Sequence, residues 1–222
     1  MLPEPGVYLL LLLLGGWIAL DGASFGQAMV SRPIVAATLA GWLVGSPVLG
    51  AAIGLVLEVF HLTVLPVGAA RYPEAGPAAV VGGASFAIAG PTPSALLTAT
   101  LFVLAWEWVG GASMRYLRQV NMRIAAVTAH PGMSPGELER RHIVSMMLDF
   151  FRGAVLVGGG IPLLTLVLVW TRVFWGLPEE VTRLAVASAV TALLASAFRL
   201  FGGGIKLFLI GASCGLLYLI LG

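Results

Sequence analysis

The sequence is poor in charged residues, which fill only 10% of its 222 positions, whereas 59% of the positions are hydrophobic and the mean hydropathy is +1.00. Because soluble domains carry about 25% charged residues, this composition predicts an integral membrane protein. The apolar runs have the length of helices rather than the short alternation of an outer-membrane barrel. We therefore expect an all-α, polytopic membrane protein whose residues 1–222 form a single membrane domain.

A second cysteine and the features of an N-terminal targeting signal are also lacking. Cys214 is the only cysteine, so no disulfide can form within the chain, and its apolar surroundings favour packing over reactivity. The N-terminus has no basic region of the kind that opens a secretory signal, and Glu4 carries the opposite charge. We expect residues 6–24 to be a first transmembrane helix that stays in the mature protein. The net charge of +2 informs membrane topology and does not indicate nucleic-acid binding.

Motifs for phosphate binding and covalent catalysis are missing as well. The triplets Gly158-Gly159-Gly160 and Gly202-Gly203-Gly204 are not followed by Lys-Ser or Lys-Thr, as a phosphate-binding loop requires. Glu58-x-x-His61 matches half of a di-iron motif, but such sites need further glutamates on other helices. We expect no catalytic nucleophile, no cofactor and no metal in this chain, and we interpret His61 as a buried histidine with satisfied hydrogen bonds.

Eight apolar segments are predicted to be helices: 6–24, 33–46, 48–66, 77–91, 93–113, 143–170, 181–199 and 204–221. Segment 33–46 would span only about 21 Å, too little for a hydrocarbon core of about 30 Å, and segment 77–91 is interrupted by glycine. Either both are re-entrant or discontinuous, as at transporter binding sites, or they are ordinary helices with displaced boundaries. We expect 6–92 to form a broken-helix substrate region and 93–222 a helical bundle.

The longest polar stretch, 114–142, indicates the orientation of the chain. It contains five arginines against only two glutamates, so the positive-inside rule places it in the cytoplasm. Within it, Ser134-Pro135-Gly136-Glu137 is typical of a helix N-terminus with proline in the first turn. Either a short amphipathic helix begins there and offers a surface to a soluble partner, or the stretch is a solvated connector.

Glycine, proline and charge are concentrated between Ser31 and Pro77. Gly50, Gly54 and Glu58 are spaced by four residues, so on a helix they share one face, and small residues at this interval let helices approach closely. Glu58 should therefore face protein rather than lipid. A charged group at the bilayer centre costs about 2.5–3.5 kcal/mol, which a cation, protonation or a hydroxyl-bearing ligand must offset.

Other polar residues flank this helix. Asp21 and Gln27 offer a carboxylate and an amide near the end of the first helix, and such groups hydrogen-bond hydroxyls. Arg32 either neutralises a carboxylate or extends to the membrane interface. Arg71 and Glu74 lie in a non-helical passage and either pair with each other or serve a site. The candidate substrate-binding residues are Asp21, Gln27, Arg32, Glu58 and Arg71.

A longer pattern runs through these residues. It comprises Leu20-Asp21, Gln27, Ser31-Arg32-Pro33-Ile34-Val35-Ala36, Leu39-x-Gly41, Gly45, Gly50, Gly54, Leu57-Glu58, Pro66-Val67-Gly68-Ala69-Ala70 and Pro73. In order and spacing it resembles enzyme IIC of the mannose/fructose/sorbose-type phosphotransferase system. The resemblance covers about residues 6–90, and beyond residue 93 only hydropathy and approximate length agree.

The resemblance implies a subunit that pairs with a IID membrane subunit to translocate sugar, while soluble IIA and IIB proteins relay phosphate from phosphoenolpyruvate. It also implies a sugar site between IIC and IID to which Asp21, Gln27 and Glu58 contribute, and no phosphohistidine in IIC. We therefore expect a multi-pass permease subunit for a hexose-like sugar in a bacterial inner membrane. Two alternatives remain: a stand-alone transporter coupled to protons through Glu58, or a regulatory or assembly subunit without transport.

Overall fold

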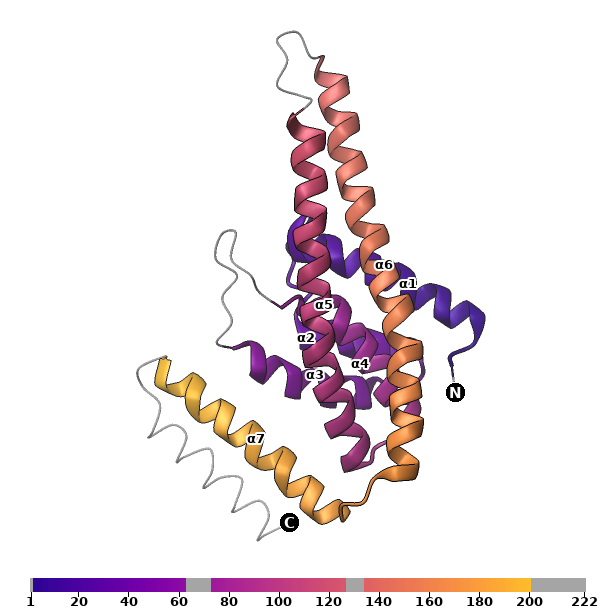
Figure 1. The fold of residues 1–222 in the computed structure, drawn as a ribbon, viewed down its shortest axis with the longest axis vertical. Helices are drawn as coiled ribbons and strands as arrows, with labels where there is room; N and C mark the ends of the chain where they lie inside the picture. The colour runs from indigo at the N-terminus through magenta and orange to yellow at the C-terminus, as the bar shows by residue number, and fades with distance from the viewer. Residues whose placement is uncertain (1, 63–72, 127–133, 201–222) are drawn as a thin grey trace.

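The computed structural model describes residues 2–62, 73–126 and 134–200, and these residues form seven helices and no strand. The helices are α1 (Pro5–Ala23), α2 (Pro33–Leu43), α3 (Pro47–His61), α4 (Ala75–Ala89), α5 (Pro93–Ala126), α6 (Pro135–Phe174) and α7 (Glu179–Leu200). Figure 1 shows α5 and α6 as a long hairpin, with the short helices α2, α3 and α4 gathered beside its lower part. The all-α expectation is confirmed, whereas the predicted helix 204–221 lies outside the described residues.

Proline marks the start of most of these helices. Five of the seven described helices begin at a proline, namely Pro5, Pro33, Pro47, Pro93 and Pro135. Proline suits the first turn because its missing N–H has no partner there in any case and its φ is already helical. The predicted starts at residues 6, 33, 48 and 93 therefore agree with the structure to within one residue.

The helices fall into two length classes. α1, α5 and α6 are long and apolar enough to cross a membrane, whereas α2, α3 and α4 have only 11, 15 and 15 residues. At 1.5 Å per residue the short helices span about 16–23 Å, less than the hydrocarbon core. The prediction of short segments at 33–46 and 77–91 is confirmed, and α3 is also shorter than predicted, since it ends at His61.

The stretch 114–142 is largely helical, which corrects the prediction of a polar loop between helices 93–113 and 143–170. α5 continues to Ala126 and α6 begins at Pro135, so their lengths are about 51 Å and 60 Å. Hydropathy detects only the apolar part of such a hairpin. The polar part stays helical because arginine is a good helix former and Glu137 pairs with Arg141 one turn later, at 2.6 Å. Ser134 caps α6, as predicted, by accepting the N–H of Glu137.

Helix α4 lies at the centre of the fold. Its residues 76–87 are all buried, and it contacts α1, α2, α3, α5 and α6. Small side chains on every side of the helix allow this packing, because a helix that is apolar all round is stable only when it is surrounded. The N-terminus of α4 is consequently held inside the protein, next to the ends of α1 and α3.

Helices α2 and α3 pack with almost no space between their backbones. A Cβ atom added at Gly41 would lie 2.7 Å from the Cα of Gly50, and one added at Gly54 would lie 2.9 Å from the Cα of Ile34. The predicted role of the glycine spacing is therefore confirmed. This close approach places Glu58, one turn beyond Gly54, against the N-terminus of α2.

We predict that Gly41→Ala lowers the free energy of unfolding by about 1–3 kcal/mol, because the added methyl group collides with backbone that cannot move away freely. The matched control is Gly6→Ala on α1, where no atom lies within 4 Å of the added Cβ. There the change should stabilise the helix by up to about 1 kcal/mol. Thermal unfolding in detergent measures both, and equal stability of the two variants would contradict the packing described here.

Candidate functional site

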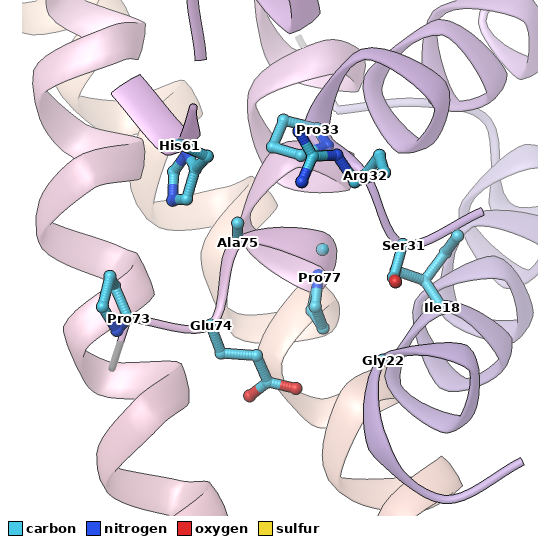
Figure 2. Close-up of a pocket in the computed structure, with 11 residues that line it drawn as sticks. Ile18, Gly22, Ser31, Arg32, Pro33, His61, Pro73, Glu74, Ala75 and Pro77 are labelled. Carbon is cyan, nitrogen blue, oxygen red and sulfur yellow. The ribbon is translucent and has the colours of Figure 1, made fainter. Parts of the chain in front are cut away.

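A cavity of about 140 Å³ lies where four elements end or begin: the end of α1, the start of α2, the end of α3 and the start of α4. Its polar walls are Ser31, Arg32, His61 and Glu74, and Figure 2 shows the last three spaced around it on different elements. Its other walls are Ile18, Gly22, Pro33, Pro73, Ala75, Gly76 and Pro77. Interrupted helices of this kind are tolerated at membrane depth only where they are buried in protein or line a cavity.

Asp21 organises the loop that leads from α1 to the cavity. Its Oδ1 accepts the backbone N–H of Ala28 at 2.6 Å, and its Oδ2 accepts that of Ser31 at 2.8 Å. Gln27 and Met29 in this loop have φ values of 49° and 62°, which side-chain-bearing residues adopt only when their surroundings enforce it. The buried Asp21 carboxylate therefore holds a strained loop in place, and with it the residues at the start of α2.

Arg32 and Glu58 form an ion pair across α2 and α3. Nη2 of Arg32 donates to Oε1 of Glu58, and the backbone N–H of Ile34 donates to Oε2 at 3.3 Å. The Arg32 side chain is 42% exposed and that of Glu58 is 15% exposed. Of the two interpretations of Arg32, neutralisation of a carboxylate is confirmed. Glu58 in addition caps the positive N-terminal end of α2.

His61 bridges α3 and α5. Its Nδ1 lies 2.8 Å from the carbonyl oxygen of Leu57, and its Nε2 lies 3.2 Å from Oε2 of Glu107. Both side chains are buried, with exposures of 8% and 2%. The interpretation of His61 as a buried histidine with satisfied hydrogen bonds is confirmed, since both ring nitrogens have partners.

Glu74 is bound by an arginine from α6. Arg152 donates from Nη2 to Oε1 of Glu74 at 2.6 Å and from Nη1 to Oε2, which is the paired geometry that an arginine fork allows. The same guanidinium donates to Oδ1 of Asp149 from Nε at 3.0 Å and from Nη2 at 2.7 Å. All three side chains are at most 10% exposed, so these charges are compensated inside the protein.

Two serines extend this cluster to further helices. Ser113 on α5 accepts Nη1 of Arg152 at 3.0 Å, and Ser24 after α1 donates to Oδ2 of Asp149. Arg152 thus connects α1, α4, α5 and α6. Since Glu74 also lines the cavity, the wall of the cavity is fixed to the α5–α6 hairpin by a buried charge cluster.

The structure brings together some of the predicted site residues. Arg32 lines the cavity and Glu58 pairs with it, whereas Asp21 acts on the loop backbone and Gln27 is exposed. Arg71 lies outside the described residues, so its predicted pairing with Glu74 stays a prediction. The carboxylate of Glu74 is bound by an arginine of α6.

His61 and Glu74 stand out in the sequence but are not included in the predicted set, and three further charged residues of the polar network are not singled out at all. They are Glu107, Asp149 and Arg152, and each lies within or beside an apolar run of the sequence. The rule that pointed to Glu58, namely that ionisable groups in apolar helices face protein or a cavity, applies equally to them. Their partners come from distant segments, so the pattern along the chain does not reveal which charges meet.

Comparison with known proteins gives a family and a fold. Residues 7–159 match the family described as the sorbose-specific IIC component of the phosphotransferase system. No curated protein was found to match the chain. A solved structure described only as a membrane protein is similar, with a TM-score of 0.71 and 19% identity over 100% of this chain and 98% of that one. The cryo-electron microscopy structure of the mannose transporter ManYZ with microcin E492 has a TM-score of 0.62 and 18% identity over the same shares. At these identities the structural likenesses show the fold alone.

We predict that Arg152→Met lowers the free energy of unfolding by about 3–5 kcal/mol, because it leaves the buried carboxylates of Glu74 and Asp149 without their cation. Adding Glu74→Gln should restore part of the loss. The matched control, Arg140→Met on the exposed side of α6, should change stability by about 0.5 kcal/mol or less. The measurement is thermal unfolding in detergent, and an Arg152 variant as stable as the control would show that the cluster does not hold the helices together.

Proposed function

Because this chain belongs to the sorbose-specific IIC family of the phosphotransferase system, we propose that it translocates a hexose-like sugar through the cavity between α1, α2, α3 and α4. The observation that carries this proposal is a polar cavity inside a body of membrane-length and shorter apolar helices. The chain is a multi-pass membrane protein, and we place it in a bacterial inner membrane. Phosphate from phosphoenolpyruvate is supplied in trans by soluble IIA- and IIB-like proteins.

The chemistry of the cavity supports a ligand rich in hydroxyl groups. Of the residues that line the cavity, Arg32 donates hydrogen bonds and the hydroxyl of Ser31 both donates and accepts them, while Glu58 is the ion-pair partner of Arg32. When a sugar leaves water, these side chains can replace the hydrogen bonds that water made to its hydroxyl groups. The sugar itself carries no charge into the membrane. Asp21 acts by ordering the loop. Gln27 is proposed to contact sugar on the strength of the family resemblance, and Arg71 is proposed to do so as a charged residue of the polar stretch between Ser31 and Pro77.

A second membrane subunit is proposed to complete the site. The cavity of about 140 Å³ is smaller than the pockets of about 300–1,000 Å³ that enclose ligands of drug size. This chain shares its fold with a chain of the mannose transporter ManYZ. We propose by analogy that a IID-like subunit supplies the remaining wall and that the sugar binds between the two proteins.

We propose that alternating access uses two parts of the fold. The short helices α2, α3 and α4 carry the cavity, whereas the long hairpin of α5 and α6 forms a scaffold. These parts are connected by the packing of α4 against α5 and α6 and by two buried polar contacts, His61 to Glu107 and Glu74 to Arg152. Transport is proposed to occur when the short-helix unit moves as a rigid body against the hairpin, as in other transporters built from discontinuous helices.

We predict that Arg32→Gln weakens the binding of mannose or sorbose by about 10–100-fold, because a hydrogen bond from a charged group is worth about 1.5–3 kcal/mol. The subunit is purified in mild detergent with the membrane protein that remains bound to it, and affinity is measured with radiolabelled sugar. The variant should still assemble with that partner, because only one side chain of the cavity wall is changed.

The matched control is Arg140→Gln, which removes an exposed arginine far from the cavity along α6. It should leave sugar affinity unchanged. Equal affinities of the native chain and the Arg32 variant would exclude this cavity as the sugar site. Uptake into vesicles by this chain alone, without a second membrane subunit or a phosphate donor, would instead favour a stand-alone transporter.

A further inference from the structure

The contact between His61 and Glu107 requires a proton, because of the hydrogen-bond partners that the two nitrogens of the ring face. Nδ1 of His61 lies 2.8 Å from the carbonyl oxygen of Leu57, and because a carbonyl only accepts, Nδ1 must carry a hydrogen. Nε2 of the same ring lies 3.2 Å from Oε2 of Glu107. A neutral ring with its hydrogen on Nδ1 would present a lone pair to a carboxylate there, and two acceptors cannot form a hydrogen bond.

Two protonation states make this contact a hydrogen bond. In one, an imidazolium donates from Nε2 to the Glu107 carboxylate; in the other, protonated Glu107 donates from Oε2 to a neutral His61. Both states hold one proton more than a neutral histidine beside a carboxylate. The pair is therefore a buried site that retains a single proton, whichever atom carries it.

Among residues 2–62, 73–126 and 134–200, the ion-pair partner of the Glu107 carboxylate is His61. Its second oxygen, Oε1, is buried and has no hydrogen-bond partner among the described residues. Arg32 and Arg152, the two arginines of the described polar network, are each paired with other carboxylates. The charged groups that surround the pair are Glu58 on α3, Arg32 at the start of α2, Glu74 at the start of α4 and Arg152 on α6.

The pair is also connected to the cavity at two points. The ring of His61 lines the cavity, and the carbonyl oxygen of Glu107 accepts the backbone N–H of Glu74, another lining residue, at 3.0 Å. If the pair lost its proton, a ring lone pair would face a carboxylate in a medium of low dielectric constant, where repulsion is poorly screened. The ring would turn away from Glu107, and this wall of the cavity would change shape.

We propose that Glu107 is a positioning residue that holds His61 in the cavity wall through one shared proton, and that sugar binding is linked to this proton. The inference rests on the proposed function, because its readout is sugar affinity. Glu107 contacts the ring and not the sugar. Because of this linkage, the site binds sugar when the His61–Glu107 pair carries the shared proton.

The test measures the affinity of the subunit, purified with its bound membrane partner, for mannose and sorbose from mildly acid to alkaline pH. The native chain should lose affinity at alkaline pH, by at most about tenfold per pH unit, as one linked proton allows. Glu107→Gln should flatten this decrease, because the amide donates to Nε2 of a neutral His61 and has no proton to lose. The matched control, Glu139→Gln on the exposed side of α6, should keep the native pH profile.

A second measurement needs no variant of the buried pair. In the alkaline range, the heat of sugar binding to the native chain should depend on the protonation enthalpy of the buffer, because binding takes up a proton. Sugar binding with no buffer dependence, or an unaltered pH profile in Glu107→Gln, overturns the inference and leaves the proposed function standing. Failure of the native chain to bind either sugar at any pH contradicts the proposed function itself, and the inference with it.

Discussion

A charge inside a lipid bilayer must find its counter-charge within the protein, and the interior of this chain is organised by that constraint. Five buried or half-buried carboxylates face two arginines and one histidine in a single region of the fold. They are Asp21, Glu58, Glu74, Glu107 and Asp149 against Arg32, Arg152 and His61. Three of the pairings, Arg32 with Glu58, His61 with Glu107 and Arg152 with Glu74, join different elements of the fold, so the cluster that makes the charges tolerable also helps to determine which helices meet. Among these described residues carboxylates outnumber arginines, and the proton that we propose to be shared by His61 and Glu107 reduces that excess.

The polar region exists because the helices around it are short. α2, α3 and α4 end inside the protein, and their ends expose backbone groups and polar side chains that lipid could not satisfy. Helix α4 makes this arrangement possible, since its small residues let it be surrounded on every side. The long hairpin of α5 and α6 supplies Glu107, Asp149 and Arg152, which hold the cavity wall from the opposite side. Ligand site and scaffold are thus formed by different helices of one fold, which are joined by the packing of α4 against α5 and α6 and by two buried polar contacts.

Sequence reasoning could predict the local features, because single residues determine them. The Ser134-Pro135 pattern indicated a helix start, and glycines four residues apart indicated that the helix face carrying Glu58 packs closely against protein. Hydropathy missed the polar continuation of α5 and α6, since it detects contact with lipid rather than helical structure. The pairings of Glu74 with Arg152 and of His61 with Glu107 could not be predicted, because they depend on how α4 and α3 lie against the hairpin. Asp21 has the carboxylate that a sugar site requires, yet the loop backbone takes up both of its oxygens.

The proposed path of the sugar runs through the cavity at the start of α4. Its most direct test is a cryo-electron microscopy structure of the subunit with its native membrane partner and bound mannose or sorbose. We expect sugar density against Arg32 and His61, with the partner subunit closing the open side of the cavity. Sugar density at a place remote from α1, α2, α3 and α4, with the charge cluster unchanged, would contradict it.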